Sequence, residues 1–94
     1  MPVKKKSLSV LKRMRSNARK AVARGVVRTS TRTYIKKARQ LITAGRADEA
    51  GEAVRIAASA LDKAAQKGVI HKNNAARRKA RLAAALNKVR ETAA

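Results

Sequence analysis

Side chains that could perform catalysis or bind a metal are few in this sequence. It contains one histidine, His71, and no cysteine, so it cannot assemble a typical zinc site. Asp48, Glu49 and Glu52 are its only clustered carboxylates. They stand at the expected start of a helix, where negative charge interacts favourably with the helix dipole, and we interpret them as structural. We therefore expect no enzymatic activity, no metal, no cofactor and no small-molecule substrate.

The side chains that could bind a ligand are mostly basic. The 94 residues include 25 Lys or Arg and 5 Asp or Glu, which gives a net charge of +20. Charge of this density repels itself in a compact protein, and anions that neutralise it stabilise the folded state. The composition therefore predicts a polyanionic partner.

Charge divides the sequence into three parts. Residues 1–40 carry 14 basic residues and no acidic one, and residues 41–70 carry 4 of each sign. Residues 71–94 carry 7 basic residues and the acidic Glu91. Two basic parts therefore flank a neutral one.

One row of basic residues runs along the first part at steps of four or five. It consists of Arg15, Arg19, Arg24, Arg28, Arg32 and Lys36. Side chains one helical turn apart, about 6 Å, can bind successive phosphates of a nucleic acid, and the release of counter-ions favours binding. The alternative is a solvated helix face, but such faces usually contain Glu, and no acidic residue precedes Asp48. We therefore predict that the row binds phosphates.

A second basic face is predicted in the last part of the chain. Its members, which share a narrow arc of a helix, are Asn74, Arg77, Arg81 and Lys88. Amide and guanidinium groups can donate hydrogen bonds to phosphates, to 2′-hydroxyl groups or to base edges, and Arg can make two such bonds at once. This face is therefore a second candidate binding surface.

The composition favours helices, since Ala, Lys, Arg, Leu and Gln are good helix formers and no alternating strand pattern occurs. We predict helices over residues 7–44, 48–67 and 73–90. Gly45 and Gly68 follow the first two, because glycine adopts the left-handed conformation of a helix C-terminus without steric cost.

Two residues could cap the third helix, Asn73 and His71. Either Asn73 or Asn74 could serve as a cap instead of binding nucleic acid. For His71 we expect a turn or capping role, or a phosphate contact, and neither metal binding nor general base catalysis.

Apolar residues at steps of three and four give each helix one buried face. On the first helix they are Val27, Thr31, Tyr34, Ala38 and Leu41; on the second, Ala50, Val54, Ala57, Leu61 and Ala64. On the third they are Ala75, Leu82, Leu86 and Val89, with an interruption at Lys79. Three such faces with short connections predict an all-α fold, a three-helix antiparallel bundle with Tyr34 as its one bulky anchor. Ile56 falls on the polar face of the second helix, where we expect an isolated exposed residue.

The predicted helices differ in length. The second and third have about 20 residues each, roughly 30 Å, whereas the first would extend for about 57 Å. We therefore expect one domain, residues 1–94. Residues 27–94 would form the three-helix bundle, and residues 1–26 a basic N-terminal extension of the first helix that projects from it.

The shortage of aromatic residues and of long apolar runs narrows the choice of polyanionic partner. Membrane-surface helices usually carry Trp, Phe or Leu opposite their basic face, and readers of single-stranded nucleic acid use stacked aromatic rings. The chain has one aromatic residue, Tyr34, and no apolar run long enough to span a membrane. Folded, helical nucleic acid is the remaining partner, and RNA is the first choice. A histone-like protein that compacts DNA is the second hypothesis, and a polybasic membrane-surface helix is the third.

The residues predicted to bind nucleic acid lie in both basic parts. They are Lys4, Lys5, Lys6, Lys12, Arg13, Arg15, Asn17, Arg19, Lys20, Arg24, Arg28, Arg32, Lys36, His71, Lys72, Asn73, Asn74, Arg77, Arg78 and Arg81.

Several segments carry a resemblance to a known family. Residues 67–82 read KGVIHKNNAARRKARL, residues 12–17 read KRMRSN, and residues 32–37 read RTYIKK. With these segments, Arg28, Thr29 and its length, the chain resembles the bacterial small-subunit ribosomal protein S20 family over nearly its whole extent. The resemblance implies a three-helix bundle that binds small-subunit ribosomal RNA directly and contributes to subunit assembly.

The same resemblance implies a place in the cell. The protein would be a monomer within the ribosome, beside neighbouring ribosomal proteins and not at a membrane. The absence of cysteine is compatible with a reducing compartment, and we expect a cytoplasmic protein.

Overall fold

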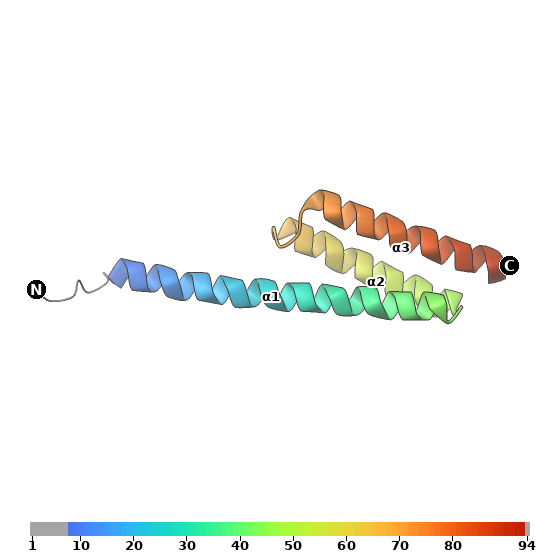
Figure 1. The fold of residues 1–94 in the computed structure, drawn as a ribbon, viewed down its shortest axis with the longest axis horizontal. Coiled ribbons are helices and arrows are strands. Elements are labelled where there is room, and N and C mark those ends of the chain that lie inside the picture. The colour runs from blue at the N-terminus through green and yellow to red at the C-terminus, as the bar shows by residue number, and fades with distance from the viewer. Residues whose placement is uncertain (1–7, 94) are drawn as a thin grey trace, which may run out of the picture.

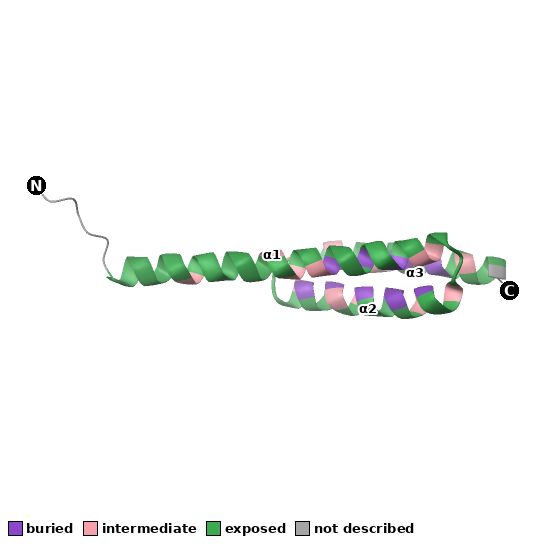
Figure 2. Ribbon diagram, turned by 90° about the horizontal axis from the view of Figure 1, so that it is seen from below, coloured by how far each residue is buried: buried purple, intermediate pink, exposed green. Residues whose placement is uncertain are grey.

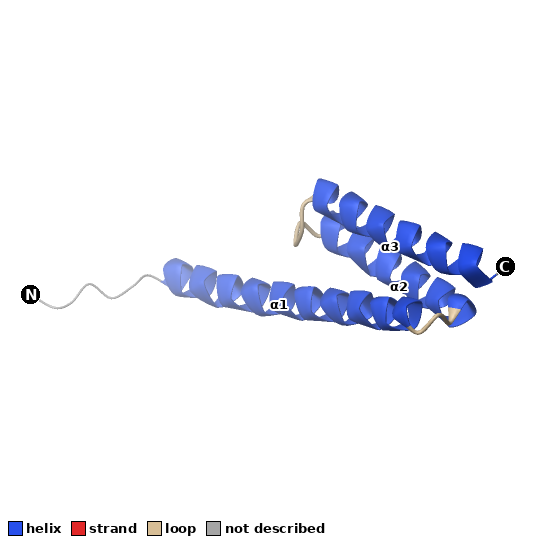
Figure 3. Cartoon of the chain, turned by 45° about the vertical axis from the view of Figure 1, so that its right-hand side comes forward, coloured by secondary structure: helices blue, strands red, loops and turns tan. Residues whose placement is uncertain are grey.

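The computed structural model describes residues 8–93 and consists of three helices. They are α1 (Leu8–Thr43), α2 (Ala47–Gln66) and α3 (Lys72–Ala93). The chain reverses at each connection, so α2 runs antiparallel to α1 and α3 (Figure 1, Figure 3). No strand occurs among the described residues, and the predicted all-α fold class is confirmed.

The second helix lies in the centre of the assembly. α2 packs along both α1 and α3, whereas α1 and α3 touch each other over a much shorter stretch. With 36 residues α1 is about 54 Å long, and its N-terminal half extends past the end of the bundle (Figure 2). Between residues 8 and 24, every residue except Ser16 is exposed. The molecule is therefore elongated, 77 Å in its longest dimension and 21 by 16 Å across.

Both predicted glycine stops are present. Gly45 has φ 74° and Gly68 has φ 75°, in the left-handed region that a side chain would strain. After α1 the amide of Gly45 donates to the carbonyl of Ile42, and that of Arg46 donates to Leu41. The same two bonds recur after α2, so each helix ends in a Schellman motif that satisfies its last carbonyl groups.

The cap of α3 is His71, one of the two predicted candidates. Its Nδ1 accepts a hydrogen bond of 3.1 Å from the backbone amide of Asn73. Because Asn73 lies inside the helix, it is not the cap. The start of α2 has no side-chain cap, and the acidic side chains of Asp48 and Glu49 occupy its first turn as predicted.

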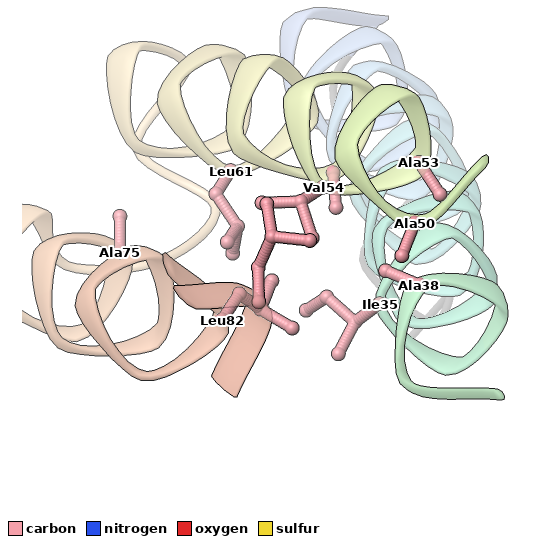
Figure 4. Packing of buried hydrophobic residues seen from close by; sticks show 10 residues of the cluster. Ile35, Ala38, Ala50, Ala53, Val54, Leu61, Ala75 and Leu82 are labelled. Carbon is pink, nitrogen blue, oxygen red and sulfur yellow. The ribbon is translucent and has the colours of Figure 1, made fainter. Parts of the chain in front are cut away.

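The core is built mainly from alanine (Figure 4). Its buried apolar residues are Ile35 and Ala38 from α1, Ala50, Ala53, Val54, Ala57, Leu61 and Ala64 from α2, and Ala75, Leu82 and Leu86 from α3. All five residues predicted for the buried face of α2 are buried, and on α3 only Val89 is half-buried instead. Small side chains let the helices approach closely, and Leu61 is the largest side chain that is fully enclosed.

The prediction that Tyr34 anchors the core is wrong. Tyr34 is 41% exposed, and its neighbour Ile35, 7% exposed, lies in the core instead. The buried face of α1 contains Thr31, Ile35 and Ala38 at steps of four and three, which is the same spacing moved toward Ile35. The polar end of a Tyr ring is more easily satisfied in solvent than in an alanine core. Thr31 can be buried because its hydroxyl donates to the carbonyl of Val27 at 2.7 Å.

This arrangement predicts the stability of two variants. Leu61→Ala should lower the free energy of unfolding by about 3 kcal/mol, because it leaves a cavity in a fully enclosed site. Tyr34→Ala should lower it by about 1 kcal/mol or less, because the ring is partly solvated. Urea unfolding followed by circular dichroism measures both. Equal losses for the two variants would show that the Tyr34 ring is buried in solution.

Candidate nucleic-acid interface

A groove between α1 and α3 gathers basic side chains from both helices. It has a volume of about 520 Å³. Its lining residues are Arg32, Ile35, Lys36, Arg39, Gln40 and Thr43 from α1 and Arg78 from α3. Four of these seven are cationic and none is acidic. The groove therefore presents positive charge and neutral hydrogen-bonding groups around the apolar side chain of Ile35.

A second hollow lies beside the first along α3. It measures about 330 Å³ and is lined by Arg39, Ile42, Thr43, Arg81, Leu82 and Ala85. Because Arg39 and Thr43 line both hollows, the two form one surface, which we call the α1/α3 groove. The groove thus brings Arg32 and Lys36 of the row predicted on the first helix close to Arg78 and Arg81 of the third. Of the face predicted on the third helix, Arg81 lines the groove, whereas Asn74, Arg77 and Lys88 are not among its lining residues.

Arg39 is the residue that the sequence analysis missed. The predicted row stops at Lys36, although the steps from Arg32 to Lys36, Arg39 and Thr43 are four, three and four. This is the spacing of one helix face. The signal for Arg39 was therefore present in the sequence.

The predicted basic row is divided into two parts by the geometry of α1. The helix is unbroken from Leu8 to Thr43, and the step from Arg19 to Arg24 is five residues. Five residues turn a helix by about 140° beyond a full circle. Arg15 and Arg19 therefore lie on a different face of α1 from Arg32, and they border a separate hollow of about 400 Å³ with Lys12, Leu8 and Leu11.

The start of α3 has its own arrangement of donors. The Oδ1 atom of Asn74 accepts hydrogen bonds from Nε of Arg78 at 2.9 Å and from Nη2 of Arg77 at 3.3 Å. The amide oxygen of Asn74 is therefore engaged within the protein, and only its NH₂ group remains to donate to a ligand. Both Arg side chains are exposed.

His71 caps the start of the same helix. Since Nδ1 of His71 accepts the Asn73 amide, only Nε2 remains for a contact with a ligand. Lys72 and Asn73, beside it, are exposed.

The other predicted residues lie along the exposed half of α1 or before it. Lys12, Arg13, Asn17, Lys20, Arg24 and Arg28 are exposed members of α1. Lys4, Lys5 and Lys6 lie outside the described residues.

The acidic residues are concentrated on α2 and are mostly paired. Arg46 contacts Glu49 at 3.4 Å, Arg55 binds Glu52, and Lys79 of α3 contacts Asp62 at 2.9 Å. Exposed pairs of this kind contribute little to stability, because water and salt screen them. The hydrogen bond from Arg55 and its positive charge lower the pKa of Glu52, so this carboxylate is ionised at neutral pH.

A hollow between α1 and α2 differs from the α1/α3 groove. Its volume is about 380 Å³, and it is lined by Tyr34, Lys37, Leu41, Glu49, Glu52, Ala53 and Ile56. Ile56 is exposed as expected, but it is not isolated, since it borders this hollow together with Tyr34. Two carboxylates line it together with Lys37, so its charge is mixed, unlike the purely cationic charge of the α1/α3 groove.

Among residues 8–93, no group of three or more His, Cys, Asp or Glu side chains could hold a metal ion. None of the described helices is long and apolar enough to cross a membrane.

Comparison with known proteins confirms the resemblance seen in the sequence. The family model "Ribosomal protein S20" matches residues 5–87. A protein of Roseiflexus sp. (strain RS-1), named "Small ribosomal subunit protein bS20", is 55% identical over 75 residues, which cover 80% of this chain and 81% of the relative. A protein of the same name from Mycolicibacterium smegmatis is 46% identical over 81 residues, which cover 86% of this chain and 94% of the relative. The chain therefore belongs to the ribosomal protein S20 family.

Proposed function

We propose that this chain is a structural constituent of the small ribosomal subunit, which binds small-subunit ribosomal RNA directly through α1 and α3 and contributes to subunit assembly. The printed name of its relatives, small ribosomal subunit protein, supports this role. The family is one of ribosomal proteins and not of enzymes. The observation that carries the proposal is the α1/α3 groove, where Arg32, Lys36, Arg39 and Arg78 surround one hollow without an acidic neighbour.

The chemistry of the groove suits an RNA backbone. Guanidinium groups can bind a phosphate with two parallel hydrogen bonds, and Lys36 adds a compact positive charge. Gln40 and Thr43 can hydrogen-bond to phosphate oxygens or 2′-hydroxyl groups. These contacts read the shape and backbone of folded RNA, and none of them requires an unpaired base.

The proposed interface has two parts with different roles. In residues 27–94, the bundle holds the groove and the start of α3 in a fixed geometry and provides preference for the correct RNA. In residues 1–26, the basic extension adds affinity through charge, and Lys4, Lys5 and Lys6 belong to this part. All twenty residues predicted from the sequence, together with Arg39, make up the proposed interface.

The proposed setting is the ribosome in the cytoplasm. There the chain is a monomer, with small-subunit ribosomal RNA as its main partner and neighbouring ribosomal proteins as further contacts.

The proposal is tested by comparing three polyanions. Purified protein should bind a folded small-subunit ribosomal RNA transcript more tightly than duplex DNA or anionic liposomes at one salt concentration. If about 8 basic side chains bind phosphates, affinity should fall by about 10³ or more between 50 and 200 mM salt. Tighter binding to duplex DNA would favour a histone-like protein, and a flat salt response would exclude docking on the RNA backbone.

The role of the groove is tested by a matched pair of Arg substitutions. Arg39→Ala should weaken RNA binding by about tenfold and reduce the salt slope by about 1, because one phosphate contact is lost. Arg55→Ala removes the same charge from α2, where Arg55 is paired with Glu52, and should change affinity by about twofold or less. Filter binding across a salt series measures both variants. Equal effects would mean that net charge alone matters.

The division between the two parts is tested by two double variants. Replacing Arg77 and Arg81 with Ala should lower the preference for ribosomal RNA over a random RNA duplex, because bonds made in one geometry are lost together with charge. Replacing Arg15 and Arg19 with Ala should weaken binding to both RNAs alike and reduce the salt slope by about 2. If each double variant lowers the affinity for ribosomal RNA and for the random duplex by the same factor, the bundle does not distinguish the correct RNA from other RNA.

A further inference from the structure

Asn74 holds two arginine side chains at once. Its Oδ1 atom lies 2.9 Å from Nε of Arg78 and 3.3 Å from Nη2 of Arg77. A guanidinium group only donates hydrogen bonds, so the oxygen and not the nitrogen of the amide must face both partners. Asn74 is half-buried, whereas Arg77 and Arg78 are exposed. A partly enclosed acceptor thus fixes two side chains that would otherwise move freely in solvent.

The held guanidinium groups keep most of their donors free. Each has five N–H donors, and each spends one of them on Asn74. Arg78 uses Nε, so both of its Nη groups remain for a bidentate contact with a phosphate. Arg78 also lines the α1/α3 groove, so its fixed orientation bears directly on that surface.

Fixing an arginine side chain before it binds affects the preference for one RNA over another more than it affects the general attraction between charges. A free Arg side chain loses its rotamer freedom on binding, and one that is already held loses less. The gain is realised only on a partner whose phosphates match the held geometry. Non-specific attraction to a polyanion depends on the number of charges, which the amide of Asn74 does not alter.

We propose that Asn74 is a positioning residue for RNA recognition, which holds Arg77 and Arg78 for contact with backbone phosphates of a folded RNA. The inference rests on the proposed function and goes beyond it, because it assigns to the Asn74 oxygen a role exerted through its two neighbours. It replaces the simpler view that Asn74 itself donates a hydrogen bond to RNA.

The test compares Asn74→Ala with Asn87→Ala, a control that removes an exposed amide from the same helix at a position outside the proposed interface. Ala is a stronger helix former than Asn, so both variants should retain α3, which circular dichroism checks. Asn74→Ala should bind a folded small-subunit ribosomal RNA transcript about fivefold more weakly, with unchanged affinity for a random RNA duplex and an unchanged salt slope. Asn87→Ala should match the wild type on both RNAs.

A triple variant separates positioning from direct contact. In a background with Arg77→Ala and Arg78→Ala, Asn74→Ala should cause no further loss, because the side chains that it holds are gone. A further loss of RNA affinity in the triple variant would overturn this inference alone. So would a single Asn74→Ala variant that prefers the ribosomal RNA transcript over the duplex as strongly as the wild type does. Equal binding of the wild type to transcript and duplex would overturn the proposed function together with it.

Discussion

The packing of α2 between two positively charged helices is the contact on which the rest of the structure depends. α1 carries eleven basic residues and no acidic one, and α3 carries seven basic residues and one acidic residue. α2 carries four acidic residues and two basic ones, and it packs along both neighbours while they scarcely touch each other. Like charges on α1 and α3 repel, and the negative element between them reduces that repulsion. The Lys79–Asp62 pair, 2.9 Å long, spans α2 and α3 in this way.

The alanine core has a second consequence for the protein. Each buried alanine removes little apolar surface from water, since burial contributes about 0.8 kcal/mol for each CH₂ group, so close packing compensates only in part for the missing large side chains. A small core that must oppose a net charge of +20 leaves limited stability. A polyanion that binds only the folded form adds its binding energy to that stability. We therefore expect folding and RNA binding to be coupled through charge.

Sequence patterns predicted the features that depend on one element at a time. The two glycine stops follow from the backbone conformation that glycine alone adopts easily, and the buried face of α2 follows from one unambiguous run of apolar residues. On α1, the spacing of apolar residues predicted Tyr34 for the core, whereas its neighbour Ile35 occupies that place. That choice depends on how α1 is rotated against α2, which only packing determines.

The candidate site likewise depends on packing between helices, which the sequence does not show. Its charged residue types were evident, but their meeting in one groove depends on the crossing of α1 and α3, so the sequence presented two separate rows. Arg39 could have been found from its spacing after Lys36. The acceptor role of Asn74 could not have been found from the sequence, because an amide has both a donor and an acceptor. Only the placement of Arg77 and Arg78 shows that the oxygen is the atom in use.

The side of the bundle around the α1/α2 hollow matters for RNA binding as much as the basic side does. A uniformly positive rod would bind RNA in any rotation about its axis, with many arrangements of similar energy. Glu49 and Glu52, each paired with an Arg side chain, line the α1/α2 hollow together with Lys37, so its charge is mixed, while the lining of the α1/α3 groove has no acidic residue. Specificity requires that wrong arrangements be disfavoured as well as the right one favoured. We therefore expect the α1/α3 groove, and not the α1/α2 hollow, to be the side of the bundle that faces RNA.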